Sequence, residues 1–366
     1  MIKLVLLSSA TSIHTIQWAK YLIQQGLDIH IVSQHPKAVD FPESIPVTLL
    51  PYKGFLGYFL NVFALRKILK EIQPDILNVH YASGYGTTAR LVNFHPYVLS
   101  VWGSDVFEFP YRSFLHKKLL EKNLASADVI ASTSRSMAIQ TNKYMTESKP
   151  IEITPFGVDL EKFKGIEDIK PLDHKLITIG TVKTLKHVYG IDILLQALSI
   201  LYQKLKLEHV GVCDQLQFRI VGGGPDLESL KALAVELKID HVTTFVGAVA
   251  HDDVPNELSK LDIYVALSRQ ESFGVAVIEA QAMKLPVVVS NVGGLPEVVQ
   301  DQQTGFVVES ENPQQAAEKL EKLVLDHELR ANMAEKGHQF VQHHFSWVAC
   351  ARTMAQVYEK MLHTLK

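Results

Sequence analysis

The first half of the chain alternates short apolar runs with longer segments whose apolar residues recur at helical spacing. Residues 2–7 predict a buried strand, residues 13–25 a helix that ends before Gly26, and residues 28–33 the next strand. Further elements of the same two kinds follow: a helix over residues 60–72 and strands over residues 76–79, 98–101 and 129–131. Strand, helix and strand in this order predict a parallel, doubly wound sheet.

The same alternation starts again after a polar, charge-mixed segment, residues 161–175, which has the composition of a linker. The strands predicted beyond it cover residues 176–180, 217–221, 243–246, 263–267 and 286–290. An amphipathic helix is predicted from residue 345 to the end of the chain. We therefore predict an α/β fold of two doubly wound Rossmann-like domains, residues 1–168 and 169–344, which face each other across a substrate cleft.

The composition fits a globular chain of 366 residues and excludes several kinds of partner. A net charge of -3 gives no basic surplus for binding nucleic acid. The two cysteines are too few for a disulfide framework and lack zinc-ligand spacing, which favours a cytoplasmic location. We expect no signal peptide and no membrane-spanning helix, because the longest charge-free apolar stretch is shorter than the roughly 20 residues that span a bilayer.

A stretch in the second half, residues 268–280, carries two carboxylates across a strand-to-helix transition. Glu271 lies in the loop, and Glu279 lies in the helix that Gly274 opens. Backbone N–H groups at the helix start suit a diphosphate, and carboxylates suit hydroxyls, so a nucleoside diphosphate sugar matches the arrangement. The alternative is a solvated surface helix whose glutamate interacts favourably with the helix dipole.

Three glycines, Gly222, Gly223 and Gly224, follow a predicted strand and precede a helix. Glycines at this position let the backbone approach a phosphate or a base closely, although a plain tight turn explains them equally well. The fingerprint of a nicotinamide-dependent dehydrogenase is disfavoured, because Leu227 stands where its third glycine belongs.

Two lysines, Lys183 and Lys186, follow the first strand of the second half and precede a helix. Their ammonium groups would stabilise charge on a leaving diphosphate without a metal, and the alternative is that both are simply solvated. The sequence contains no Asp-x-Asp metal motif. We therefore predict no metal site and no separate cofactor.

Together these motifs resemble those of the family 4 glycosyltransferases, a retaining group with the GT-B fold. Residues 271–279 resemble the Glu-x7-Glu motif of that family. Other segments are similar to its glycine turn, its linker signature and its second glycine-rich segment: residues 222–225, residues 155–163, and residues 286–297 with 304–305.

The resemblance implies that Glu271 contacts the transferred sugar, Glu279 the ribose, and Lys183 with Lys186 the diphosphate. It also implies a set of donor-binding residues: Gly222, Gly223, Gly224, Val246, Ser272, Phe273, Gly274 and Val275. The implied activity is metal-independent, retaining transfer of a sugar from a nucleoside diphosphate sugar to a glycan or lipid-linked acceptor, in the assembly of a bacterial surface polysaccharide or glycoconjugate. The first domain is expected to be the acceptor side and the second to bind the nucleotide sugar donor. The last helix, residues 345–366, is expected to pack back on the N-terminal domain.

The sequence departs from the family pattern at three places. Residues 188–189 stand where the family has a lysine before the helix glycine, residues 8–12 lack paired glycines, and Trp102 stands where many members have a histidine. We therefore predict that His80, His14 and Asp105, near strand ends, orient the acceptor or the donor sugar, with a purely structural role as the alternative.

Residues 52–67 mix aromatic and basic side chains just before and within a predicted helix. Such a segment can rest on a membrane surface and meet a lipid-linked acceptor. We favour the alternative that its aromatic side chains fill the core of the N-terminal domain.

The predicted mechanism is front-face transfer, in which the departing diphosphate oxygen helps to deprotonate the acceptor. The two glutamates are expected to lie too far apart for the ~5–5.5 Å carboxyl pair of retaining hydrolases. A phosphorylase on the same scaffold and a non-catalytic partner subunit that keeps the donor site are the alternatives.

Overall fold

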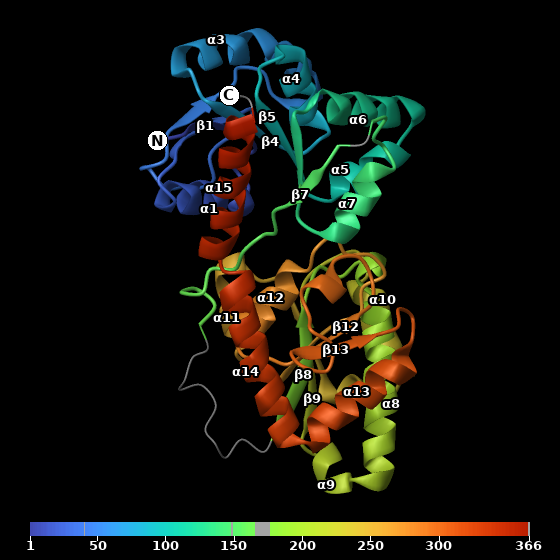
Figure 1. The fold of residues 1–366 in the computed structure, drawn as a ribbon. Coiled ribbons are helices and arrows are strands. Elements are labelled where there is room, and N and C mark those ends of the chain that lie inside the picture. The colour runs from blue at the N-terminus through green and yellow to red at the C-terminus, as the bar shows by residue number, and fades with distance from the viewer. Residues whose placement is uncertain (40, 148, 165–175, 365–366) are drawn as a thin grey trace. The chain divides into compact units, whose positions relative to one another are not determined.

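The computed structural model describes residues 1–39, 41–147, 149–164 and 176–364, and the chain divides into two compact units (Figure 1). The first unit comprises Met1–Gly157 and Trp347–Lys366, and the second comprises Val158–Ser346. The domain boundary predicted between residues 168 and 169, and most of the predicted linker, lie in residues 165–175, outside the described residues.

The described part of the first unit contains a parallel sheet of seven strands in the order β3-β2-β1-β4-β5-β6-β7. Its strands are β1 Lys3–Leu7, β2 Asp28–Ser33, β3 Val47–Leu49, β4 Ile76–His80, β5 Tyr97–Val101, β6 Val129–Ser132 and β7 Ile151–Ile153. Its helices are α1 Ile13–Gln24, α2 Gly54–Leu60, α3 Val62–Ile72, α4 Gly84–Val92, α5 Ser104–Phe107, η1 Phe109–Tyr111, α6 Phe114–Ser126, α7 Arg135–Asn142 and α15 Trp347–Thr364. Strands run outward from β1 and β4 in both directions, which confirms the predicted doubly wound topology.

Helices cover both faces of this sheet. α3, α4 and α6 pack side by side and contribute Leu65, Ala89 and Leu124 to a core that includes Leu77 of β4. Asn78, the next residue of β4, points to the opposite face, where its Nδ2 donates to Oη of Tyr358 in α15 at 2.6 Å. α15 packs beside α1 on that face, so the C-terminal helix belongs to the first unit (Figure 1).

The described part of the second unit contains a parallel sheet of six strands in the order β10-β9-β8-β11-β12-β13. Its strands are β8 Ile177–Val182, β9 Leu216–Val221, β10 Thr243–Gly247, β11 Ile263–Ala266, β12 Val287–Ser290 and β13 Gly305–Val308. Its helices are η2 His187–Tyr189, α8 Ile191–Glu208, α9 Val210–Cys213, α10 Leu227–Glu236, η3 Asp240–Val242, η4 His251–Asp253, α11 Val254–Leu258, α12 Val275–Ala282, η5 Leu295–Glu297, α13 Pro313–Leu325 and α14 His327–His344.

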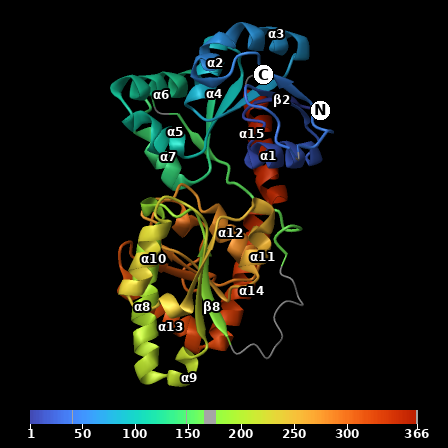
Figure 2. The same cartoon turned by 180° about the vertical axis from the view of Figure 1, so that it is seen from behind.

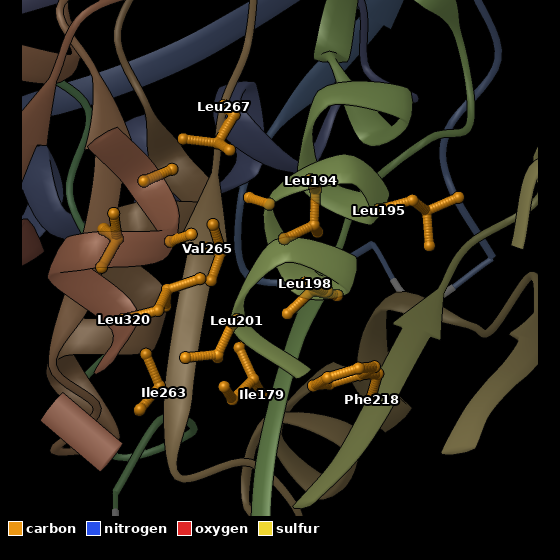
Figure 3. Packing of buried hydrophobic residues seen from close by; sticks show 14 of the residues in the cluster. Ile179, Leu194, Leu195, Leu198, Leu201, Phe218, Ile263, Val265, Leu267 and Leu320 are labelled. Carbon is orange, nitrogen blue, oxygen red and sulfur yellow. The ribbon is translucent and has the colours of Figure 1, made fainter. Parts of the chain in front are cut away.

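Two groups of helices enclose this second sheet. α8, α10 and α13 lie on one side of it, and α11, α12 and α14 lie on the other (Figure 2). Leu194, Leu198 and Leu201 of α8 recur every three or four residues and pack against Ile179 of β8 and Val265 of β11 (Figure 3). Burying each such side chain contributes about 1.5–3 kcal/mol, so this layer holds the strands whose ends carry the predicted site.

The interpretation that the aromatic side chains of residues 52–67 fill the core is wrong for most of them. Phe55 and Phe63 are exposed to 64% and 78%. Tyr58 is the exception, since it packs against α4 with its ring centroid 5.4 Å from that of Tyr85. Helical spacing reveals an apolar stripe, but it does not reveal whether another element covers the stripe.

Candidate active site

Loops at the carboxyl ends of the second unit's strands bring the predicted residues together. β8 and β11 are neighbours in the sheet, and successive strands run outward from them in opposite directions. A point where the strand order reverses in this way leaves a crevice outside the carboxyl ends of the strands. Lys183 directly follows β8, and Glu271 lies in the loop after β11.

Lys183 and Glu271 form an ion pair at this point. Nζ of Lys183 lies 2.6 Å from Oε2 of Glu271, and the two side chains are exposed to only 18% and 13%. The ammonium group also lies 4.4 Å from the centroid of the Tyr189 ring. Burial is the largest single effect and lowers the pKa of Lys183, but the charge of Glu271, the hydrogen bond to it, and the nearby Tyr264 and Tyr189 together raise that pKa above its usual value. Lys183 is therefore a firmly charged group.

Glu279 lies in the second turn of α12 and is buried. Burial raises the pKa of its carboxyl group to about 7, although the charges of Lys183 and Lys162 act in the opposite direction. No hydrogen bond from a described residue offsets this burial. A buried carboxylate without such a partner is suited to a ligand that brings hydroxyl groups.

The glycine turn after β9 lies against the chain's own backbone. Gly222 has a φ of +146°, and a Cβ at this position would collide with the carbonyl oxygen of Lys183. A Cβ at Gly224 would collide with the carbonyl oxygen of Leu185, whose N–H donates to the carbonyl oxygen of Gly223 at 2.9 Å. These glycines therefore seat the loop that carries Lys183. Their contact with a donor nucleotide stays a prediction.

A second pair of glycines seats the loop that carries Glu271. Gly293 follows β12 with a φ of +54°, and a Cβ there would collide with the carbonyl oxygen of Glu271. The N–H of Gly294 donates to that same oxygen at 3.1 Å. The contacts explain why glycines are needed in the segment that resembles the family signature, because these glycines fix the backbone of Glu271.

Arg269 is a positioning residue that the sequence motifs did not single out. Its guanidinium group donates to both carboxylate oxygens of Asp192 in α8, at 2.8 and 2.7 Å, and pairs with Glu311 just before α13. A further bond reaches the carbonyl oxygen of His187 at 2.7 Å. The partners lie 77 and 42 residues away in sequence, so spacing alone could not reveal them.

The predicted contacts of the donor with the start of α12 fall on a helix terminus. Gly274, with a φ of +113°, is the N-cap, Val275 is the first helical residue, and Ser272 and Phe273 precede the cap. The first N–H groups of a helix have no partner within the helix and suit an anion. The structure thus places these residues at the carboxyl edge of the sheet, and their contact with a donor stays a prediction.

Val246 and Lys186 are the remaining residues predicted for the second unit. Val246 bulges out of the pairing of β10 with β9, where the register shifts between Phe245 and Gly247. Lys186 is exposed and directly precedes η2. Neither residue joins the ion pair of Lys183 with Glu271, and their predicted roles are untested.

His80 ends β4 in the first unit and is fully buried. Its Nδ1 lies 2.9 Å from Oγ of Ser8, and its ring centroid lies 4.3 Å from that of Trp102. Burial lowers the pKa of His80 to about 3, so the ring is neutral near pH 7. These contacts are those of a packed neutral ring, and the catalytic role of His80 stays a prediction.

Asp105 lies in α5 and is also buried. Its carboxylate accepts hydrogen bonds from the N–H groups of Ala82, Trp102 and Gly103 at 2.9, 3.1 and 2.8 Å. Burial raises the pKa of Asp105, and these backbone bonds oppose the rise. Asp105 therefore holds the loops after β4 and β5 in place. Its predicted part in catalysis is untested.

Within the described residues, no group of three or more His, Cys, Asp or Glu side chains is arranged to hold a metal ion. Nor does any described helix combine the length and the apolar character that crossing a membrane requires.

The family of the chain follows from two sequence profiles that between them match most of its length. Residues 163–340 match the family described as glycosyl transferases group 1. Residues 3–134 match the family described as glycosyl transferase 4-like. The chain therefore belongs to the group 1 glycosyltransferases of the family 4 type.

Individual relatives agree with this assignment. The chain is 27% identical over 352 residues to N-acetyl-α-D-glucosaminyl L-malate synthase of Bacillus anthracis, covering 89% of this chain and 87% of that protein. It is 27% identical over 355 residues to the capsular polysaccharide biosynthesis glycosyltransferase CapM of Staphylococcus aureus, covering 89% and 88%. The structure of Anabaena Alr3699/HepE in complex with UDP-glucose is similar, with a TM-score of 0.77, 16% identity and coverage of 98% and 100%. The last likeness shows a shared GT-B fold.

Proposed function

We propose that this glycosyltransferase moves a sugar, with retention of anomeric configuration, from a nucleoside diphosphate sugar to an acceptor hydroxyl. The donor site of this proposal is the carboxyl edge of the second unit's sheet. The observation that carries it is the pairing of Lys183 with Glu271, close enough to the buried Glu279 for the lysine charge to act on its pKa.

Each of these side chains has a matching group on such a donor. Lys183 would bind the diphosphate, Glu271 a hydroxyl of the transferred sugar, and Glu279 the ribose hydroxyls. In the structure Lys183 and Glu271 pair with each other. A bound donor offers an anion to one and a hydroxyl to the other, so separating the pair leaves neither charge buried and unpaired.

The proposed step is a front-face displacement. The bond between the anomeric carbon and the β-phosphate oxygen breaks with its electron pair going to the diphosphate. The acceptor oxygen forms the new bond to that carbon on the same face, and its proton passes to the departing phosphate oxygen. Lys183 and the first N–H groups of α12 would stabilise the growing negative charge. This arrangement needs no metal ion, because Lys183 and the helix terminus supply the positive charge.

The acceptor in this proposal is a glycan or a lipid-linked sugar, and the process is assembly of a surface polysaccharide or glycoconjugate. The likeness to the CapM protein supports the process, and the likeness to a structure that holds UDP-glucose supports a nucleotide sugar donor. The proposed location is the cytoplasm, with peripheral contact at the inner face of the membrane.

The membrane contact of this proposal is made by α2 and α3. Their exposed apolar side chains include Phe55, Phe59 and Phe63, and the exposed basic residues are Lys53, just before α2, and Lys67 of α3. Apolar side chains that enter the headgroup region, flanked by lysines that attract anionic lipids, are the two features of a peripheral membrane surface.

Product stereochemistry tests the proposed reaction. The purified chain is incubated with UDP, GDP and ADP sugars, and the anomeric protons of the products are followed by NMR. Retention in the glycoside product, with no sugar covalently attached to the protein in intact mass spectra, supports front-face transfer. Inversion, or a trapped glycosyl adduct, contradicts it. Donor binding without turnover on any acceptor would instead support a non-catalytic role.

A further inference from the structure

A pocket of about 420 Å³ lies within the first unit, and neither Lys183 nor Glu271 lines it. The loops that follow β1, β2, β4 and β5 form it, so it occupies the carboxyl edge of the first sheet. Eight of its ten lining residues carry a hydroxyl group, and three of these are the tyrosines Tyr58, Tyr81 and Tyr85. None of the ten is Lys, Arg, Asp or Glu.

The one ionisable imidazole in this lining, that of His35, is held in a defined protonation state by its neighbours. Oη of Tyr85 accepts the N–H of Gln34 at 3.1 Å and lies 2.7 Å from Nδ1 of His35. It also lies 3.3 Å from Oγ of Ser33, whose own proton is donated to the carbonyl oxygen of His35 at 2.9 Å. Oγ of Ser33 already accepts the N–H groups of Ala10 and His35 at 3.0 Å each, so Nδ1 is the acceptor left for the tyrosine proton. Nδ1 then has no proton of its own, and Nε2 carries the ring proton.

A neutral His35 leaves the pocket without a formal charge. Burial lowers the pKa of His35, in agreement with this hydrogen-bond pattern. The adjacent carboxylate of Asp105 does not line the pocket, and it is occupied by three backbone N–H groups. The pocket thus presents hydroxyl groups, aromatic rings and one N–H donor, all uncharged.

Such a lining suits an uncharged sugar better than a ligand with a phosphate or carboxylate group. The hydroxyl groups of a sugar can both donate to and accept from serine, threonine and tyrosine, and its C–H faces can pack on tyrosine rings. Ser12 and Ser83, the N-caps of α1 and α4, line the pocket and bring helix N–H donors close to it. A phosphate or carboxylate would gain from those N–H groups but would be desolvated without a cationic side chain, at a cost of several kcal/mol.

We propose that this pocket holds the sugar ring of the acceptor and selects rings that carry no charged substituent. His35 and Tyr85 are its specificity-determining pair, since Tyr85 fixes the imidazole as a neutral donor. The inference rests on the proposed function, because it takes the first unit as the acceptor side. One wall of the pocket is Tyr58 of α2, the helix that also carries exposed apolar side chains. This helix has seven residues and is about 10 Å long. It would therefore bring a lipid-borne sugar directly to the pocket.

The test compares neutral and charged sugar probes on the full chain without nucleotide. The neutral probes are the methyl glycosides of glucose, galactose and mannose. The charged probes are glucose 6-phosphate and glucuronic acid. Binding is measured by saturation-transfer NMR. We expect at least one neutral glycoside to bind about tenfold more tightly than either charged sugar.

Two variants and one control assign the effect to the pocket. His35→Gln should weaken binding of the neutral glycoside, and His35→Lys should reverse the preference so that glucose 6-phosphate binds more tightly. His30→Gln is the matched control, since His30 lies in β2, does not line the pocket, and bonds to Thr48 at 2.8 Å. Circular dichroism shows whether each variant is folded.

The outcomes separate this inference from the proposed function. If the charged sugars bind as tightly as the neutral ones, or if no glycoside binds while a nucleotide sugar still binds, the inference is overturned and the donor site stands. Glycoside binding that His35→Gln and His30→Gln weaken equally also overturns it. If the glycoside binds as expected but no nucleotide sugar binds, the pocket stands and the proposed function fails.

Discussion

Nζ of Lys183 lies 2.6 Å from Oε2 of Glu271, and this contact joins the ends of two neighbouring strands across 88 residues of sequence. The glycines after β9 and β12 seat the two loops, so the pair is fixed by backbone contacts as well as by charge. Loops held in this way keep the backbone at Lys183 and Glu271 in place, which lowers the entropy lost when a ligand binds.

Replacing Lys183 tests whether its charge serves the reaction. Lys183→Met should lower kcat/KM by about 10²–10³-fold, because the growing charge on the diphosphate loses its buried partner. The matched control is Lys231→Met, since Lys231 pairs with Glu228 on the exposed surface of α10. Steady-state kinetics give kcat/KM for both variants. An equal fall in kcat/KM in both would contradict a role for Lys183 in the reaction.

Glu279 should make stability depend on pH. Its pKa in the folded chain is about 7, above the ordinary value of 4.5. Between pH 4.5 and about pH 7, the folded state therefore still holds a proton that the unfolded state has released. Stability should therefore fall as pH rises through this window, by up to about 3 kcal/mol at about 1.4 kcal/mol per pKa unit.

Glu279→Gln removes this dependence. The variant should melt at a higher temperature than the parent chain at pH 8 and at nearly the same temperature at pH 4.5, measured by differential scanning calorimetry. Comparing the two proteins at each pH cancels the contributions of all other titrating groups. A melting difference that is the same at both pH values would contradict a raised pKa for Glu279.

Gly293 should be intolerant of any side chain. Gly293→Ala places a Cβ against the carbonyl oxygen of Glu271, so it should displace that loop and weaken binding of the donor. Gly26→Ala is the matched control, because Gly26 has a φ of +84° but nothing within 4 Å of an added Cβ. The control carries only the backbone strain, about 1–2 kcal/mol, and should bind the donor normally. Calorimetric titration with the nucleotide that binds the parent chain measures the affinity of both variants.

The exposed phenylalanines of α2 and α3 should matter for membranes and not for folding. A triple serine variant at Phe55, Phe59 and Phe63 should lose flotation with vesicles that contain anionic lipid and keep its melting temperature. A double serine variant at Leu207 and Val210, which are equally exposed in the second unit, should float like the parent chain. Flotation of the triple variant at the parent level would end the membrane proposal.

The sequence predicted the layers of this fold well because both sheets are parallel and buried. Each strand of four or more buried residues stands out as an apolar run, and most predicted strands agree with the structure to within two residues. β3 and β7 were not predicted, because they are edge strands of only three residues, and β13 of four residues was also missed.

The chemistry of the site was predictable only in part. Residue type and position brought out Lys183, Glu271 and Glu279, since each lies near a strand end or a helix start. The ion pair itself, the buried state of Glu279 and the bracing by Arg269 depend on which strands are neighbours, and local spacing does not contain that information. The aromatic residues of α2 were misjudged for a related reason, because a helical pattern does not say which element covers it.

Nucleotide binding at the second unit tests the central claim most directly. A thermal-shift panel of UDP, GDP, ADP and their sugar conjugates, with NAD as the control, is measured on the parent chain and on Glu279→Ala. At a ligand concentration of 100 Kd, binding contributes about 2.7 kcal/mol, enough for a shift of several degrees. We expect one nucleotide family to raise the melting temperature of the parent chain and to have little effect on the variant. Stabilisation by NAD alone, or equal stabilisation of both proteins, would contradict the donor site proposed at Lys183, Glu271 and Glu279.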